Sequence, residues 1–147
     1  MTPVFASQTK DPELNEAAGA FVSQLCFGRP DAIEKFCSMA VFHYGHMVAG
    51  TLFYDWDPQS GVLQLSSAST DRRWLTRPVV RAMFSMAFDL IGAQLAILRV
   101  AETNHNMVEI AQRFGFDGVL IPRMRGRDEA EWLFTLTDDA WRASRWC

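Results

Sequence analysis

The chain has 147 residues, and 49% of them are hydrophobic, which suits one domain (residues 1–147) with a real core. Its formal net charge of −3 gives no general attraction to nucleic acid or to acidic membranes. Residues 1–15 contain no basic stretch followed by an apolar core, and no apolar run approaches the ~20 residues that span a bilayer, so we expect no membrane partner.

Cysteine usage points to a reducing compartment. Cys26, Cys37 and Cys147 are odd in number and lack the spacing of metal ligands or of a CxxC motif. We therefore expect free thiols, a cytoplasmic protein and no metal site.

The N-terminal third predicts one helix and little else. Residues 1–15 are polar, with at most a short strand at residues 4–7. Residues 16–27 place their apolar side chains near one helical face, and Gly28 ends this helix. Asp31 is then expected to cap a second short helix over residues 32–36.

Three antiparallel strands follow. Residues 39–44 and 47–56 alternate as strands around a two-residue turn at Gly45-His46, which predicts a hairpin. A second turn at residues 57–61 leads to a third strand at residues 62–68.

A helix of roughly four turns is predicted over residues 77–91. Thr76 is the expected N-cap, Pro78 fits the first turn, and Gly92 ends the helix. The helix dipole and three nearby arginines favour an anion at this N-terminus; they are Arg72, Arg73 and Arg77.

The most informative stretch is residues 95–116. Residues 95–100 form an apolar run short enough for a buried strand, and a helix ended by Gly115 follows. Thr103 or Asn104 can cap that helix. Two last strands are predicted at residues 119–123 and 132–137.

This stretch resembles the acetyl-CoA-binding core of the GNAT superfamily of N-acetyltransferases. The spacing from Asn104 to Gly115-Phe116 matches that core, and the hairpin with Gly45 and Gly50 resembles its second and third strands. The resemblance covers about residues 41–141 and is closest to compact phage and prophage proteins. It implies an α/β fold with a mixed, mostly antiparallel sheet, flanking helices and one parallel pair, residues 62–68 and 95–100, splayed at the C-terminal ends.

The resemblance also implies acetyl-CoA as acetyl donor, an amine acceptor and a possible homodimer. It assigns cofactor contacts to one strand, to the loop before the long helix and to Asn104; these residues are Leu65, Ser66, Ser67, Ala68, Arg72, Arg73, Trp74, Leu75, Thr76 and Arg77. Trp74 and Thr76 or their neighbours stand where the family has small residues, and Ala111 stands where many members have a tyrosine acid.

The catalytic base is expected among residues after the strand at 95–100. Gln64 lies where some members carry a glutamate, but an amide takes no proton. Glu102 and then His105 are the next choices, each also readable as an ordinary surface residue. The C-terminal residues 138–147, with Trp141 and Trp146, are expected to pack on a neighbouring chain.

Two other functions stay open. The departures from the family pattern fit a GNAT-shaped binding or structural protein without chemistry. The arginines of the loop, pooled with those at residues 123, 125 and 127, fit a small RNA-associated module.

Overall fold

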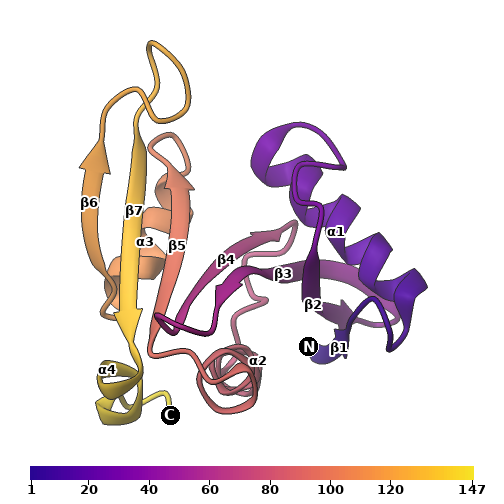
Figure 1. Cartoon of the computed structure of the whole chain (residues 1–147). Coiled ribbons are helices and arrows are strands. Elements are labelled where there is room, and N and C mark those ends of the chain that lie inside the picture. The colour runs from indigo at the N-terminus through magenta and orange to yellow at the C-terminus, as the bar shows by residue number, and fades with distance from the viewer.

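The computed structural model describes all 147 residues and contains one seven-stranded sheet of order β1-β2-β3-β4-β5-β7-β6 (Figure 1). The strands are β1 (Thr2–Ala6), β2 (Phe36–His43), β3 (His46–Asp57), β4 (Val62–Ser69), β5 (Leu95–Ala101), β6 (Asp117–Ile121) and β7 (Glu131–Thr137). The helices are α1 (Pro12–Phe27), α2 (Arg77–Ser85), its π-helical continuation η1 (Met86–Ile91), α3 (His105–Arg113) and α4 (Asp138–Ala143). All neighbouring strands pair antiparallel except β4 and β5. The predicted fold class is confirmed.

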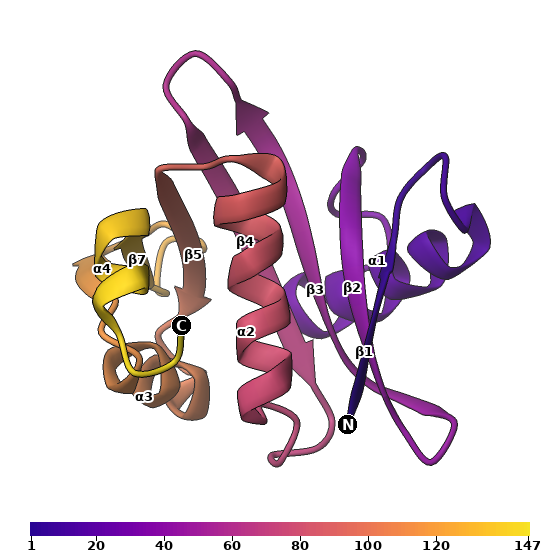
Figure 2. The ribbon, with the colours of Figure 1, turned by 90° about the horizontal axis from the view of Figure 1, so that it is seen from below.

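The helices cover the sheet from two sides. On one face α1 buries Val22 against Leu52 and Tyr54 of the sheet. On the other face α2, η1, α3 and α4 share the main core, in which Phe84 and Phe134 are buried. Figure 2 shows α2 lying across the sheet and α3 and α4 beside it. The sheet therefore separates the side of the molecule covered by α1 from the side covered by α2, η1, α3 and α4.

The parallel pair separates before either strand ends. β4 and β5 pair only from Val62↔Leu95 to Leu65↔Leu98. Beyond that point β4 continues to Ser69 with β3 as its partner, and β5 continues to Ala101 with β7. The predicted splay at the C-terminal ends is confirmed, and it opens the sheet between these two strands.

The short helix expected at residues 32–36 does not form. Phe36 begins β2 instead, because the buried Asn15 side chain donates to the Phe36 carbonyl (3.1 Å) and accepts from the Ser38 hydroxyl (2.6 Å). The Phe36 ring also fills the space beside Gly19, where a Cβ would not fit. Tertiary contacts with α1 thus fix an extended start for β2.

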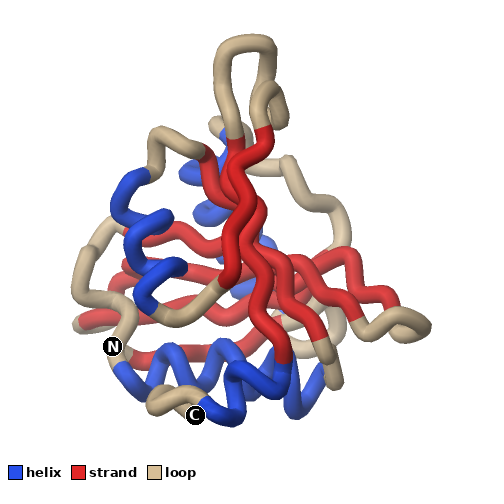
Figure 3. The backbone as a smooth tube through the Cα atoms, turned by 90° about the vertical axis from the view of Figure 1, so that its left-hand side faces the viewer, coloured by secondary structure: helices blue, strands red, loops and turns tan.

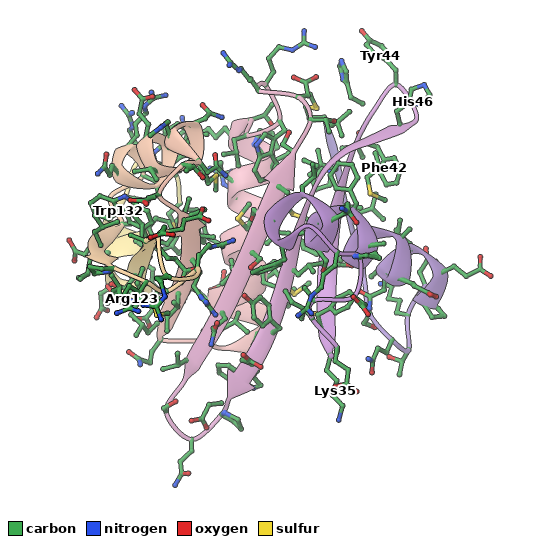
Figure 4. All side chains as sticks on the ribbon, turned by 90° about the horizontal axis from the view of Figure 1, so that it is seen from above. Lys35, Phe42, Tyr44, His46, Arg123 and Trp132 are labelled. Carbon is green, nitrogen blue, oxygen red and sulfur yellow. The ribbon has the colours of Figure 1, made fainter.

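The strand predicted at residues 119–123 lies two residues earlier, at Asp117–Ile121. The start of α1 and the hairpin turn also differ from the sequence prediction, for local reasons. Helix α1 begins at Pro12, since the Asp11 carboxylate caps it by accepting from the Leu14 backbone N–H. The hairpin turn is Tyr44-Gly45, with positive φ angles of 50° and 81°, and His46 already begins β3. Figure 4 shows the Tyr44 and His46 side chains at this hairpin tip.

The C-terminal residues contact their own chain, so the prediction that they cover a neighbour is wrong for Trp141, whereas for the partly buried Trp146 it stays a prediction. Trp141 of α4 is 2% exposed, with its ring centroid 4.9 Å from that of Phe84. Trp146 packs edge-on against Phe114, also at 4.9 Å. These contacts hold the end of the chain against α2 and α3.

Candidate active site

A small cavity and a large cleft adjoin at the splay. An apolar cavity of about 20 Å³ lies on the α2–α3 side, and a cleft of about 540 Å³ lies on the α1 side. Ser67, Leu98 and Met107 line both. The two spaces therefore adjoin at these residues, one on each side of the sheet.

The β4 residues at the splay present their backbone to the opening. The Cys26 thiol donates to the Ser67 carbonyl at 3.4 Å, and this carbonyl lies beyond the last β4–β5 pair. Since the N–H and C=O of one strand residue point the same way, the Ser67 N–H faces the opening as well. The side chains are occupied elsewhere: Ser66 bonds Tyr54 (2.8 Å) and Ser67 bonds Thr51 (2.8 Å). Leu65 and Ala68 flank this pair on the strand, as the sequence prediction places them.

Cys26 is a hydrogen-bond donor here rather than a nucleophile. Burial raises the pKa of its thiol to about 11, against the opposing effect of the nearby Arg125 charge. The thiolate that a nucleophilic cysteine needs is therefore scarce at neutral pH.

The predicted phosphate loop precedes α2 and is only partly free. The Thr76 hydroxyl caps the helix through the Val79 N–H (3.4 Å), as predicted, and Trp74 is 3% exposed within the core. Leu75 and Arg77 donate their backbone N–H to no protein group. These two donors and the helix dipole fit a phosphate oxygen.

The three arginines of that loop differ in availability. Arg73 forms a two-point ion pair with Asp71 (3.0 and 3.1 Å), and this guanidinium lowers the pKa of Asp71 to about 2. Arg77 donates to the Arg145 carbonyl and lies 6.0 Å from the Trp146 ring centroid. Arg72 makes no side-chain hydrogen bond, so it is the freest cation of the set.

A groove between the loop and α3 continues from this N-terminus. It has a volume of about 200 Å³, and its lining includes Arg72, Leu75, Asn106 and Arg113. Trp146 forms part of the same wall. The groove joins cationic and apolar groups, a combination that suits a nucleotide.

The turn after β5 holds the residues predicted for catalysis. The Asn104 side chain caps α3 by accepting from the Met107 N–H (3.3 Å), and Asn104 also lines the cleft. His105 is exposed at the start of α3 and does not line the cleft. Glu102 accepts from the Ala130 N–H (3.0 Å), so its carboxylate holds the β6–β7 loop and lies outside the cleft lining.

Three charged residues of the site escaped the sequence analysis, and a fourth, Arg125, was considered there only for an RNA contact. Arg99, Arg125 and Glu129 line the cleft, and Glu131 lies behind them, 1% exposed and paired with both arginines. The one sequence signal was Arg99, a charge within the otherwise apolar strand at residues 95–100. Figure 3 shows the β6–β7 loop, which carries Arg125 and Glu129, projecting beyond the sheet.

The arginines that the sequence analysis considered together as an RNA contact lie on both sides of the sheet. Arg72, Arg73 and Arg77 adjoin α2, whereas Arg125 donates to the Cys26 carbonyl of α1 (2.9 Å). Figure 4 places Arg123 beside the β6–β7 region. These groups do not form one continuous basic surface.

Three further features bear on the expected function classes. No helix is both apolar and long enough to cross a bilayer. No three histidine, cysteine, aspartate or glutamate side chains gather in a way that would hold a metal ion. All three cysteines are free thiols.

Comparison with known proteins relates the chain by structure alone, since no protein-family model and no curated sequence matches it. A GCN5-related N-acetyltransferase from Brucella melitensis matches with a TM-score of 0.67 and 18% identity over 96% of this chain and 78% of that one. A chimera of Vibrio cholerae spermidine N-acetyltransferase with hSSAT gives a TM-score of 0.71 and 8% identity over 98% of this chain and 100% of that one.

A point mutant of the Vibrio cholerae enzyme also matches, with a TM-score of 0.71 and 9% identity over 97% of this chain and 98% of that one. None of these comparisons supports the narrower resemblance to phage and prophage proteins. The mostly antiparallel seven-stranded sheet, its one parallel pair and the flanking helices match this fold. The chain has the fold of the GNAT N-acetyltransferases.

Proposed function

We propose that this protein is an acetyl-CoA-dependent N-acetyltransferase that transfers the acetyl group by direct attack of an amine on the thioester. The observation that carries the proposal is the opening between β4 and β5, because Ser67, Leu98 and Met107 line both the cavity beside α2 and α3 and the cleft beside α1. We infer that donor and acceptor meet at these shared residues from opposite faces of one sheet, which converts their encounter into a positioned reaction.

The residues on the α2–α3 side fit the donor. Arg72 and the free N–H groups of Leu75 and Arg77 suit the pyrophosphate, and the groove along α3 suits the nucleotide. The backbone from Ser66 to Ala68, which pairs with β3 but has no partner on β5, suits the amides of the pantetheine arm. Acetyl-CoA, when bound, supplies the activated acetyl thioester.

On the cleft side, we assign each chemical task to a group of this chain. The Ser67 N–H, which faces the opening, stabilises negative charge on the thioester carbonyl oxygen. Asn104 fixes the start of α3 at the edge of the cleft. The acceptor's ammonium must lose a proton before it attacks. A carboxylate that lines the cleft can accept this proton as a general base.

We assign that task to Glu129 and give Glu102 a positioning role. Glu129 lines the cleft, and its carboxylate accepts only a long hydrogen bond from the Thr103 hydroxyl (3.4 Å). Glu102 holds the next residue of the same loop through the Ala130 N–H. The sequence analysis chose Glu102 or His105 as the base. Kinetics of variants must distinguish that assignment from Glu129.

The decisive experiment measures thiol release from acetyl-CoA with a panel of primary amines. We expect release that depends on both acetyl-CoA and amine, with mass spectrometry detecting the acetylated amine. Binding of acetyl-CoA without turnover of any amine would instead indicate a CoA-binding protein of this fold. The free cysteines agree with the expected cytoplasmic setting, and size-exclusion chromatography tests the expected homodimer.

A further inference from the structure

One buried carboxylate serves two guanidinium groups at the floor of the cleft. Glu131 is 1% exposed and accepts from Arg99 Nε at Oε2 (2.8 Å) and from Arg125 Nε at Oε1 (3.0 Å). Both partners approach through Nε, so neither guanidinium presents its terminal fork to Glu131. The cluster carries two positive charges and one negative charge.

The cluster has donors that no protein group uses, and Arg99 borders a neighbouring pocket as well as the cleft. Both terminal nitrogens of Arg99 and one of Arg125 have no hydrogen-bond partner in the protein, whereas the other terminal nitrogen of Arg125 donates to the Cys26 carbonyl (2.9 Å). The Arg99 side chain is 33% exposed and that of Arg125 is 15% exposed, and both line the cleft. A planar guanidinium with free terminal N–H groups is well suited to bind a carboxylate or phosphate.

Contacts around Arg125 hold the cluster in place. Its guanidinium lies over the Phe27 ring at 5.2 Å from the centroid, and its bond to Cys26 ties the β6–β7 loop to the end of α1. A site whose cations are fixed in advance binds an anion without the entropy cost of ordering them. The opposite charge, on Glu129, lines the cleft near Thr103, at the end of β5.

We propose that the acceptor is an amine that also carries an anionic carboxylate or phosphate group. Arg99 and Arg125 bind the anionic group, while the amine lies toward Glu129 and the β4–β5 opening. This inference rests on the proposed acetyltransfer. It disfavours a polycationic acceptor such as spermidine, because two guanidinium groups with one shared counter-charge would repel it.

The test compares matched acceptors on the intact protein. The panel holds L-amino acids, their carboxamides, the corresponding amines without the carboxylate, phosphoethanolamine with ethanolamine as its neutral match, and spermidine. We expect kcat/KM for an anionic acceptor to exceed that for its neutral match by about 10- to 100-fold, as for a charge-assisted hydrogen-bonded pair. The amino-acid and phosphoethanolamine arms distinguish a carboxylate from a phosphate.

Variants assign the preference to the cluster. Arg99→Gln should raise KM for the anionic acceptor alone, leaving kcat, the neutral acceptors and the affinity for acetyl-CoA within about two-fold. Arg99→Lys keeps a charge beside Glu131 without the guanidinium fork and should show an intermediate loss. The matched control is Arg142→Gln. It removes an exposed arginine of α4 that is paired with Asp89 of η1.

The outcomes separate the two claims. Acetylation of carboxamides or spermidine in preference to the anionic acceptors overturns this inference and leaves the acetyltransferase intact. An unchanged acid-to-amide ratio in folded Arg99→Gln and Arg99→Lys also overturns it. Failure to bind acetyl-CoA, or binding without transfer to any member of the panel, overturns the inference together with the proposed function.

Discussion

Replacing Glu129 by glutamine tests which carboxylate removes the proton from the acceptor. The structure gives Glu129 one side-chain partner, the Thr103 hydroxyl at 3.4 Å, which is long for a hydrogen bond between oxygens. An amide of the same shape therefore removes the negative charge with little effect on the fold. We expect the free energy of unfolding to change by less than about 1 kcal/mol.

The expected kinetic effect is much larger than the structural one. A general base contributes roughly 10²–10⁴-fold, so losing it raises the barrier by about 2.7–5.4 kcal/mol. We expect Glu129→Gln to lower kcat by about 10²-fold or more. The affinity for acetyl-CoA should stay unchanged.

Glu102→Gln is the matched control, since the two residues hold adjoining parts of one loop. The glutamine retains an oxygen that accepts from the Ala130 N–H, a bond of 3.0 Å in the wild type. We expect kcat to stay within about five-fold, because the loop keeps its tether. The assay follows thiol release on a verified acceptor from pH 5 to 10.

One pattern of results would refute this assignment. If Glu102→Gln loses kcat while Glu129→Gln retains it, the base is Glu102 and not Glu129. If neither variant loses kcat, water carries the proton without help from either carboxylate.

Three further predictions concern the donor site, the core and the thiol. Arg72→Ala should weaken acetyl-CoA by about 1–2 kcal/mol by calorimetry, and Arg73→Ala by less, since Asp71 already neutralises Arg73; equal losses would contradict this ranking. Phe134→Ala should cost about 3–5 kcal/mol in chemical denaturation because Phe134 is fully buried, whereas Val119→Ala, at 63% exposed, should cost less than about 0.5 kcal/mol. The Cys26 thiol should label slowly at pH 8 and faster as pH rises toward about 11, its raised pKa, because labelling requires the thiolate; fast labelling at pH 8 in folded protein would show that burial does not hold the thiol neutral.

Much of the sheet could be predicted because local signals agree with the tertiary structure. An apolar strand, a capped helix and a second apolar strand require a crossover connection, and this places β4 beside β5 in parallel. The caps Thr76 and Asn104 were also readable, since a side-chain oxygen before an amphipathic run has one common role. Gly92 ends the helical stretch with a φ of 92°, as predicted.

The failures occurred where distant contacts outweigh local preference. The segment at residues 32–36 has a plausible cap, yet Asn15 of α1 holds Phe36 in a strand, and no pattern near residue 36 reports this. In the same way, the sequence near Trp141 is typical of an exposed C-terminal aromatic residue. In the structure, α4 places the Trp141 ring against Phe84. Neither contact follows from a recognisable spacing in the sequence.

The candidate site also has a part that local sequence signals predict and a part that only the folded chain brings together. The backbone of β4 and the start of α2 follow from element order, so residues 65–68 and 72–77 were found by position. The cluster at the floor of the cleft joins Arg99, Arg125 and Glu131, which come from β5, a loop and β7 and meet only in the folded chain. Glu102 was selected for its place after β5, but a bond to the Ala130 N–H directs its carboxylate to the loop.

Calorimetric titration of acetyl-CoA into the folded protein tests the central claim most directly. The account predicts binding of one acetyl-CoA per chain, weakened by rising salt because phosphate charges are paired by Arg72 and its neighbours. Addition of CoA alone should compete for the same site. An absence of binding at millimolar acetyl-CoA, with the protein folded by circular dichroism, would contradict the claim that the β4–β5 opening is an acetyl-CoA site.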